Sequence, residues 1–239
     1  MALPTLNSTR YSTTVPSTGQ EIEFRPFLVK EEKILMVAME SKDPKLMIKG
    51  LKDILTACVF DDIDVDRLTN FDLEELFLRL RSKSVGEKVN VNLKCSECGA
   101  MTPQEINLDD VKTEGITDNR TVMMTDTVGI EFDYPSLDLI SGMDYSEEDF
   151  TTEEQVAITM KLIKSCIKSI FDDDNVWDVK DQSDKEIESF LDGLNAAQFT
   201  AITEYFGNIP TLAYTVNYNC IKCGHANEIQ LKGIQSFFI

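Results

Sequence analysis

Apolar and polar side chains alternate around a Pro-Ser-Thr-Gly turn between residues 13 and 27, which predicts a pair of short strands. The apolar period then becomes that of a helix over 30–41, 44–59 and 70–82. The last of these segments has apolar residues at spacings of three and four, which predicts one buried helix face. The members of that face are Leu73, Leu76, Phe77 and Leu80.

Strand alternation begins at residue 88 and runs directly into Cys95-Ser-Glu-Cys98-Gly, after which a return strand is expected. The same arrangement occurs a second time, where a strand over 212–219 runs into Cys220-Ile-Lys-Cys223-Gly and a return strand follows. The two segments therefore form an internal repeat, in which each copy is a β-hairpin with a C-x-x-C-G knuckle at its tip.

The region between the repeats, 109–211, is expected to be helical apart from a strand piece over 122–134. Three capping boxes, which begin at Thr151, Ser183 and Asn195, mark helix starts. An apolar stripe follows the first box and predicts one long helix. The stripe consists of Val156, Met160, Ile163, Ile167 and Ile170.

These patterns predict an α+β fold, with a mainly helical body and a zinc-ribbon-like pair of β-hairpins split by a long helical insertion. We divide the chain into an N-terminal strand pair with helices (1–87), the split ribbon (88–108 plus 212–239) and an inserted acidic helical region (109–211). A compact zinc ribbon has about 15–20 residues between its cysteine pairs. Here 121 residues lie between Cys98 and Cys220, so the ribbon would tie two distant parts of the chain together.

Four cysteines in two C-x-x-C pairs predict a metal site formed by Cys95, Cys98, Cys220 and Cys223. Thiolates three residues apart on a tight turn can face one ion, and four of them complete a closed tetrahedral zinc site. Such a site has no open position for water, so the zinc would be structural. Iron–sulfur ligation, a disulfide and two cysteine turns without metal are the alternatives.

For the remaining cysteines and the single histidine, the simplest interpretation is a position without a functional role. Cys58 and Cys166 lie on apolar helix faces, where free cysteine is an ordinary buried residue. His225 follows the second knuckle by two residues. It could replace a cysteine ligand or donate to a thiolate, but an exposed position on the knuckle is the simpler expectation.

Composition narrows the function classes. The 239-residue chain has 23 Lys and Arg against 42 Asp and Glu, a net charge of −19, which repels phosphate backbones and argues against nucleic-acid binding. No secretion signal and no membrane-length apolar run are visible, so we expect a cytosolic protein with reduced cysteines. No phosphate loop, nucleophile elbow or zincin motif is visible either, and we expect no enzyme and no small-molecule substrate.

Two segments resemble a known family. The sequence over 16–33 contains a Pro-Ser-Thr-Gly-Gln turn and then Phe-Arg-Pro-Phe-Leu-Val-Lys-Glu-Glu-Lys before a helix. The sequence over 76–87, Leu-Phe-Leu-Arg-Leu-Arg-Ser-Lys-Ser-Val-Gly-Glu, leads into the first knuckle. Together with the second knuckle, these segments resemble the baseplate hub assembly proteins of T-even-type, contractile-tailed bacteriophages. The resemblance covers most of the chain and is weakest in the acidic middle.

The resemblance implies a baseplate hub assembly factor or chaperone that contacts other hub or tail proteins in the host cytoplasm. The alternatives are a structural subunit of the hub in the virion tail baseplate and, from a different class, a zinc-ribbon nucleic-acid-binding regulator. The regulator would use a basic cluster formed by Arg79, Arg81, Lys83, Lys88 and Lys94. The segment over 24–33 is interpreted either as a docking surface or as a strand-to-helix corner packed into the core.

Overall fold

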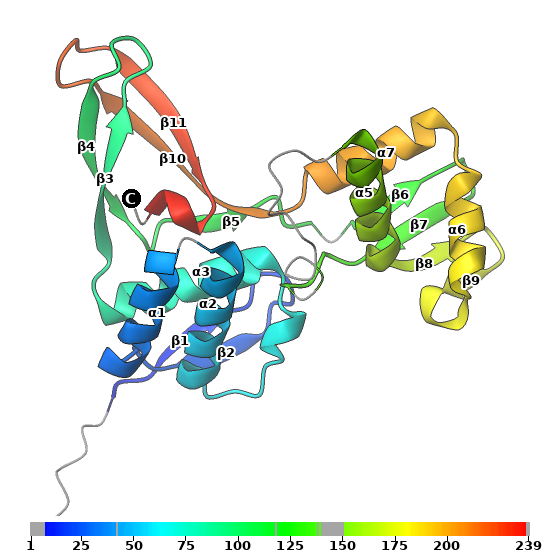
Figure 1. Ribbon diagram of the computed structural model, residues 1–239, viewed down its shortest axis with the longest axis horizontal. Helices are drawn as coiled ribbons and strands as arrows, with labels where there is room; N and C mark the ends of the chain where they lie inside the picture. The colour runs from blue at the N-terminus through cyan, green and yellow to red at the C-terminus, as the bar shows by residue number, and fades with distance from the viewer. Residues whose placement is uncertain (1–7, 42, 118, 138, 140–150, 238–239) are drawn as a thin grey trace, which may run out of the picture. The chain divides into compact units, whose positions relative to one another are not determined.

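The computed structural model describes residues 8–41, 43–117, 119–137, 139 and 151–237. Two compact units form the described chain: unit 1 comprises residues 1–114 and 210–239, and unit 2 comprises residues 115–209. The chain thus leaves unit 1 after strand β5, builds unit 2, and returns to unit 1 with strand β10 (Figure 1).

Unit 1 combines a strand pair, three helices and two long hairpins. Its strands are β1 (Tyr11–Thr14), β2 (Glu21–Phe24), β3 (Lys88–Lys94), β4 (Met101–Asn107), β5 (Lys112–Glu114), β10 (Thr211–Asn219) and β11 (Ala226–Lys232). Its helices are α1 (Val29–Ser41), α2 (Pro44–Cys58) and α3 (Asn70–Ser84), with 3₁₀ turns η1 (Val65–Arg67) and η3 (Ile234–Phe237). All pairings are antiparallel: β1 with β2, β3 with β4, and β10 between β11 and β5.

Helix α3 is the centre of the unit 1 core. The four residues of its predicted buried face are each at most 2% exposed, which confirms the period-based prediction. Thr69 caps the helix, and its hydroxyl and the Asp72 carboxylate satisfy each other's backbone N–H groups in a capping box. Phe237 of η3 is completely buried, so the described part of the apolar C-terminal segment fills the core.

A buried ion pair fixes the corner between β2 and α1. Arg25 Nη2 donates to Glu31 Oε1 at 2.9 Å, and the backbone N–H of Leu28 donates to the second Glu31 oxygen. The Glu31 side chain is 2% exposed, and the Arg25 side chain is 13% exposed. Since Phe24 and Phe27 are also buried, this part of the 24–33 segment is a packed strand-to-helix corner.

Unit 2 is a four-stranded antiparallel sheet with three helices. The strands pair in the order β6 (Thr121–Met123), β7 (Gly129–Phe132), β8 (Ile167–Phe171) and β9 (Val176–Asp178). The helices are α5 (Thr152–Cys166), α6 (Asp184–Asp192) and α7 (Ala196–Gly207), and η2 (Val179–Asp181) precedes α6. The three predicted capping boxes are confirmed at the starts of α5, α6 and α7. One core joins the helices to β7 and β8, with Phe132 and Ile202 completely buried within it.

The prediction of a mainly helical body is wrong. The described residues are 41% helical and 28% strand, with six helices and eleven strands in four sheets. The apolar stripe predicted one helix through Ile170, but α5 ends at Cys166 and the next five residues form β8 in the middle of the unit 2 sheet. Apolar residues three apart, such as Ile167 and Ile170, are typical of one face of a helix, but they also occur in a strand that is buried on both faces. The segment forms a strand because it pairs with β7 on one side and with β9 on the other. The pairing with β7 contains a bulge after Glu131.

Candidate metal centre

The two C-x-x-C-G knuckles have the same backbone geometry. In the first, the N–H of Cys95 donates to the carbonyl of Ala100 at 2.9 Å, and the N–H of Gly99 donates to the carbonyl of Cys95 at 3.0 Å. In the second, Cys220 bonds to His225 at 2.8 Å and Gly224 bonds to Cys220 at 2.9 Å. Each glycine has a positive φ, +70° and +73°, which a residue with a Cβ adopts at a cost. The sequence repeat is thus also a repeat of local structure.

Unit 1 brings the two knuckles together at the tips of the β3–β4 and β10–β11 hairpins, which lie side by side in Figure 1. The sulfur of Cys95 lies 3.8 Å from that of Cys223, and the sulfur of Cys98 lies 3.6 Å from that of Cys220. All four sulfurs are within 4.8 Å of one another. Sulfurs at the corners of a tetrahedron around a zinc ion, with Zn–S bonds of about 2.3 Å, are about 3.8 Å apart. The four predicted residues therefore form a cluster of the size that a single ion requires.

Hydrogen bonds between the hairpins hold the knuckles in register. Asn227 on β11 accepts hydrogen bonds from the N–H and the hydroxyl of Ser96, at 3.0 and 2.9 Å, and its amide donates to the sulfur of Cys95 at 3.6 Å. In the other direction, the hydroxyl of Thr102 on β4 accepts from the N–H of Ile221 at 3.5 Å. Asn227 and Thr102 each follow the second cysteine of their own knuckle by four residues, so the repeat is approximately two-fold symmetric.

Sequence reasoning did not find Asn227 and Thr102, although the sequence contains a signal for them. Strands β4 and β11 have the same burial pattern over their first six residues, and these two positions are the buried polar ones in it. When the two copies of the repeat are placed over one another, a polar residue occupies an inward-facing strand position in both. A buried polar side chain needs a hydrogen-bond partner, and here each finds it on the opposite knuckle.

The protein environment favours thiolates at one cysteine of each pair. Backbone N–H groups of its own knuckle, that of Cys223 foremost, lower the pKa of Cys220 to about 6. The backbone N–H of Cys98 likewise lowers the pKa of Cys95. The backbone N–H of His225 also favours the thiolate of Cys223, but the adjoining cysteine sulfurs and burial outweigh it and raise the pKa of Cys223 to about 12. Without a cation the cluster cannot hold four negative charges, and a divalent ion would remove that repulsion.

The donor set fits a structural zinc ion. Four cysteine sulfurs are a soft, tetrahedral ligand set of the kind that zinc or a single iron takes, and they leave no ligand position for a substrate. A cluster with inorganic sulfide needs ligand sulfurs further apart than 4.8 Å, because its iron atoms lie between them. Cys95 and Cys220 are buried, whereas Cys98 and Cys223 are exposed.

The other sequence candidates lie outside this cluster. Among the described residues, His225 is exposed and is not part of the four-residue metal-binding group. Cys58 and Cys166 are 1% and 2% exposed, as predicted, and burial raises the pKa of their thiols to about 11 and about 12. Both are inert core residues.

The predicted basic cluster is largely engaged in ion pairs within unit 1. Arg79 pairs with Glu75 at 3.0 Å, Lys83 pairs with Asp109 at 3.0 Å, and Lys88 pairs with Glu105 at 2.6 Å. Arg79 also donates to the carbonyls of residues 108 and 111, which ties α3 to the segment that follows the first hairpin. These contacts give the cationic side chains a structural role.

The fold and the cluster define an α+β protein of two units, in which two cysteine-tipped hairpins that are distant in sequence share one metal-binding group. The chain belongs to the family of T4 bacteriophage base plate proteins, whose family model matches residues 8–239. This match confirms the resemblance to baseplate proteins of T4-type phages. No curated protein and no solved structure is significantly similar to the chain.

No described helix has both the length and the apolar character that crossing a membrane requires.

Proposed function

We propose that the protein is an assembly factor of the phage baseplate hub, which acts through contacts with other baseplate proteins and carries a structural zinc ion on Cys95, Cys98, Cys220 and Cys223. It would act in the host cytoplasm without catalysing a reaction. The family relationship supports the connection with the baseplate. The finer role rests on the resemblance to hub assembly proteins and on the closed donor set of the cluster.

The observation that carries the proposal is the placement of the four sulfurs. They come from two hairpins separated by 121 residues, yet they lie within 4.8 Å of one another. An ion at this point would tie the tips of the β3–β4 and β10–β11 hairpins to each other within unit 1. Because four protein ligands complete its coordination, such an ion would organise a surface for partners and leave no site for substrate chemistry.

Quantitative mass spectrometry of purified virions and of infected-cell lysate tests the assembly role. We expect the protein to be abundant in the lysate and far below one copy per particle in the virion. A resident baseplate protein, counted in both samples, is the control for recovery. A fixed stoichiometry with the hub proteins in the virion would instead make the chain a structural subunit and overturn the assembly-factor role.

Complementation tests the contribution of the metal. A phage that lacks this protein should be rescued by the wild-type chain and by the H225A variant, which changes an exposed residue of the same knuckle. The C98S/C223S variant should not rescue it, because two of the four ligands are lost. Full rescue by C98S/C223S would show that the metal is not needed for the function.

A further inference from the structure

Helix α1 is apolar around most of its circumference but lies on the surface of unit 1. Only Glu31 and Ala38 of its thirteen residues are buried. Val37 is 69% exposed and Met36 is 64% exposed. A helix with apolar residues on all sides is usually covered on all sides. We call one group of exposed apolar side chains on α1 and the neighbouring helix α2 the α1–α2 patch, which consists of Ile34, Met36, Val37, Met39 and Leu46.

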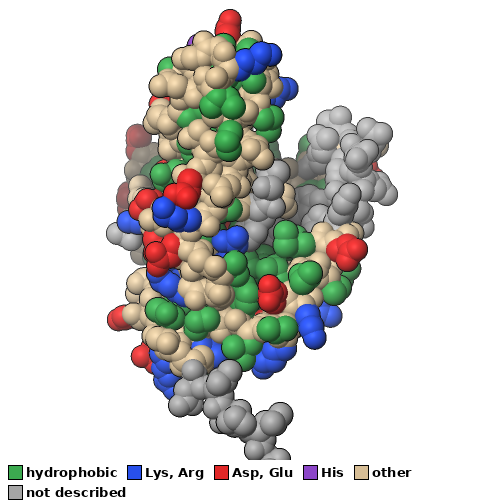
Figure 2. Space-filling view, turned by 90° about the vertical axis from the view of Figure 1, so that its left-hand side faces the viewer, with side chains coloured by type: hydrophobic (Ala, Val, Ile, Leu, Met, Phe, Trp, Pro, Cys, Tyr) green, Lys and Arg blue, Asp and Glu red, His purple; other side chains and the backbone are tan. Residues whose placement is uncertain are grey.

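The α1–α2 patch is hollowed. A cavity of about 420 Å³ lies between α1 and α2, lined by Ile34, Val37 and Leu46 among others. Gly50 lets the two helices approach closely here, because a Cβ on it would lie 2.9 Å from the Cβ of Ala38. Figure 2, which views unit 1 from the side of α1, shows hydrophobic side chains gathered on this face, with Lys and Arg as well as Asp and Glu side chains around them.

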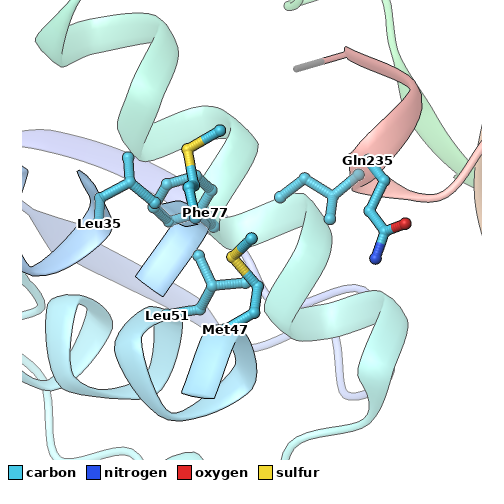
Figure 3. A pocket seen from close by; sticks show the side chains of 7 residues that line it. Leu35, Met47, Leu51, Phe77 and Gln235 are labelled. Carbon is cyan, nitrogen blue, oxygen red and sulfur yellow. The ribbon is translucent and has the colours of Figure 1, made fainter. Parts of the chain in front are cut away.

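A second, smaller pocket lies on the opposite side of α1. Its volume is about 180 Å³, and Leu35, Met47, Leu51 and Phe77 point into it from three helices, with Gln235 of η3 at its rim (Figure 3). Flexible and apolar linings of this kind accept an apolar side chain from a partner. The surface thus offers space for anchors on both sides of α1.

The charges at the larger cavity indicate what occupies it. Lys33 on α1 and Lys49 on α2 line it from both sides, together with one carboxylate, Asp53. Within the described part of the chain, neither lysine has an ion-pair partner. An occupant with carboxylates beside apolar anchors would pair with both.

Unit 2 of the chain itself has this chemistry. It contains 21 acidic and 6 basic residues, a net charge of −15, whereas unit 1 carries only −4. A cavity of about 360 Å³ in unit 2 is lined by apolar side chains that include Trp177 and Phe190, with Asp172 and Glu186 at the same place. Trp177 is 40% exposed, and its neighbour Val176 is 72% exposed.

We propose that the α1–α2 patch of one copy of the chain docks on the Trp177 surface of unit 2 of a second copy. We define that surface by Trp177 and the exposed Asp173 and Asp174 of the turn before β9. Contact between two α1–α2 patches would place the lysines of one copy against those of the other, which is unfavourable. Contact between two copies of unit 2 would bring together two surfaces that each belong to a unit with a net charge of −15. The head-to-tail contact is the arrangement that pairs opposite charges. Since each copy keeps one free surface of each kind, association continues into a ring or an open chain.

Analytical ultracentrifugation of the zinc-loaded 239-residue chain between about 1 and 100 µM tests this proposal. We expect the average mass to rise with concentration above the 27.0 kDa of one chain and to fall when salt is raised from about 50 to 500 mM. The V37E variant should weaken association at least about tenfold, because it puts a charge in the centre of the contact. K33E/K49E and D173K/D174K should each do the same through charge repulsion.

Mixing the two charge-reversed proteins gives the most specific test. K33E/K49E and D173K/D174K should each remain monomeric alone and associate when mixed, because every contact then pairs opposite charges again. K112E/K232E is the matched control for K33E/K49E, because it changes the net charge by the same amount. Its two exposed lysines both lie opposite Ala213 in the β11–β10–β5 sheet, and the variant should associate like wild type.

Three results would overturn the proposal. The first is a wild-type protein that stays monomeric over the whole concentration range. The second is association that survives both V37E and K33E/K49E. The third is association that depends on the unit 1 residues but is unchanged in D173K/D174K, since this would assign the patch to a symmetric contact between copies of unit 1.

Discussion

Removing the metal should destabilise unit 1 and leave unit 2 unchanged. The ion would close a loop of 121 residues between Cys98 and Cys220, and the chain-entropy relation for a cross-link of that length gives about 5 kcal/mol. This value is a ceiling, because β10 also pairs with β5 and keeps part of the closure without metal. Unit 1 has 144 residues and an unfolding entropy of about 0.3 kcal/mol/K, so its Tm should fall by about 5 to 15 °C.

The chain contains a built-in probe that separates the two units. Its one tryptophan, Trp177, lies in β9 of unit 2, so at concentrations where the chain is monomeric its fluorescence follows the unfolding of unit 2. Far-UV circular dichroism follows both units. After chelation, the melting temperature of unit 1 measured by dichroism should fall, while the melting temperature measured by fluorescence should not change. Added zinc should restore the melting temperature of unit 1.

Variants distinguish loss of the site from side effects of the chelator. C98S/C223S should melt like the chelated wild type and should not respond to zinc. H225A should behave like untreated wild type and bind one equivalent of zinc. The reasoning is refuted if chelated and untreated proteins share the same dichroism midpoint, or if the Trp177 midpoint falls by the same amount as that of unit 1.

Three further predictions concern single side chains. The buried Arg25–Glu31 pair lowers the pKa of Glu31 from 4.5 to about 2, so its stabilisation is complete above pH 4.5 and is lost as the pH falls toward 2. E31Q should therefore lower the free energy of unfolding at pH 7 by about 3 kcal/mol and change it little at pH 2. Urea titrations at several pH values measure this, and a difference between wild type and E31Q that is the same at pH 7 and pH 2 would contradict it. N227A leaves the N–H of Ser96 without its acceptor and should weaken zinc about 10- to 100-fold in a chelator competition; unchanged affinity would show that the contact between the hairpins is dispensable. F132A removes a completely buried ring from unit 2 and should cost about 3 to 5 kcal/mol, seen in the Trp177 transition but not in that of unit 1.

The sequence allowed the cluster to be predicted because cysteine spacing is a local property that a turn preserves. Both C-x-x-C-G knuckles follow a strand, and the structure places the four sulfurs together. Helix starts were predictable for the same reason, since a capping box such as Thr151–Glu154 is satisfied within one turn.

Features that depend on distant partners could not be predicted from the sequence. Ile167 and Ile170 suit the face of α5, and only pairing with β7 and β9 turns that segment into a strand. Asn227 looks like an ordinary polar residue in a return strand until Ser96 lies opposite it, 131 positions away. In both cases the deciding contact lies outside any local window.

The split of the metal ligands between two hairpins has a consequence for the order of synthesis. A ribosome that adds about 5–20 residues per second produces Cys220 about 6 to 24 seconds after Cys98. During that interval the first knuckle offers two thiols, and unit 2 emerges and can fold. A chain that stops anywhere within the intervening 121 residues has only half of the ligands. Only chains in which translation has passed through unit 2 would therefore bind the metal tightly. Fragments with two thiols would lack this stabilisation and would be more susceptible to proteolysis.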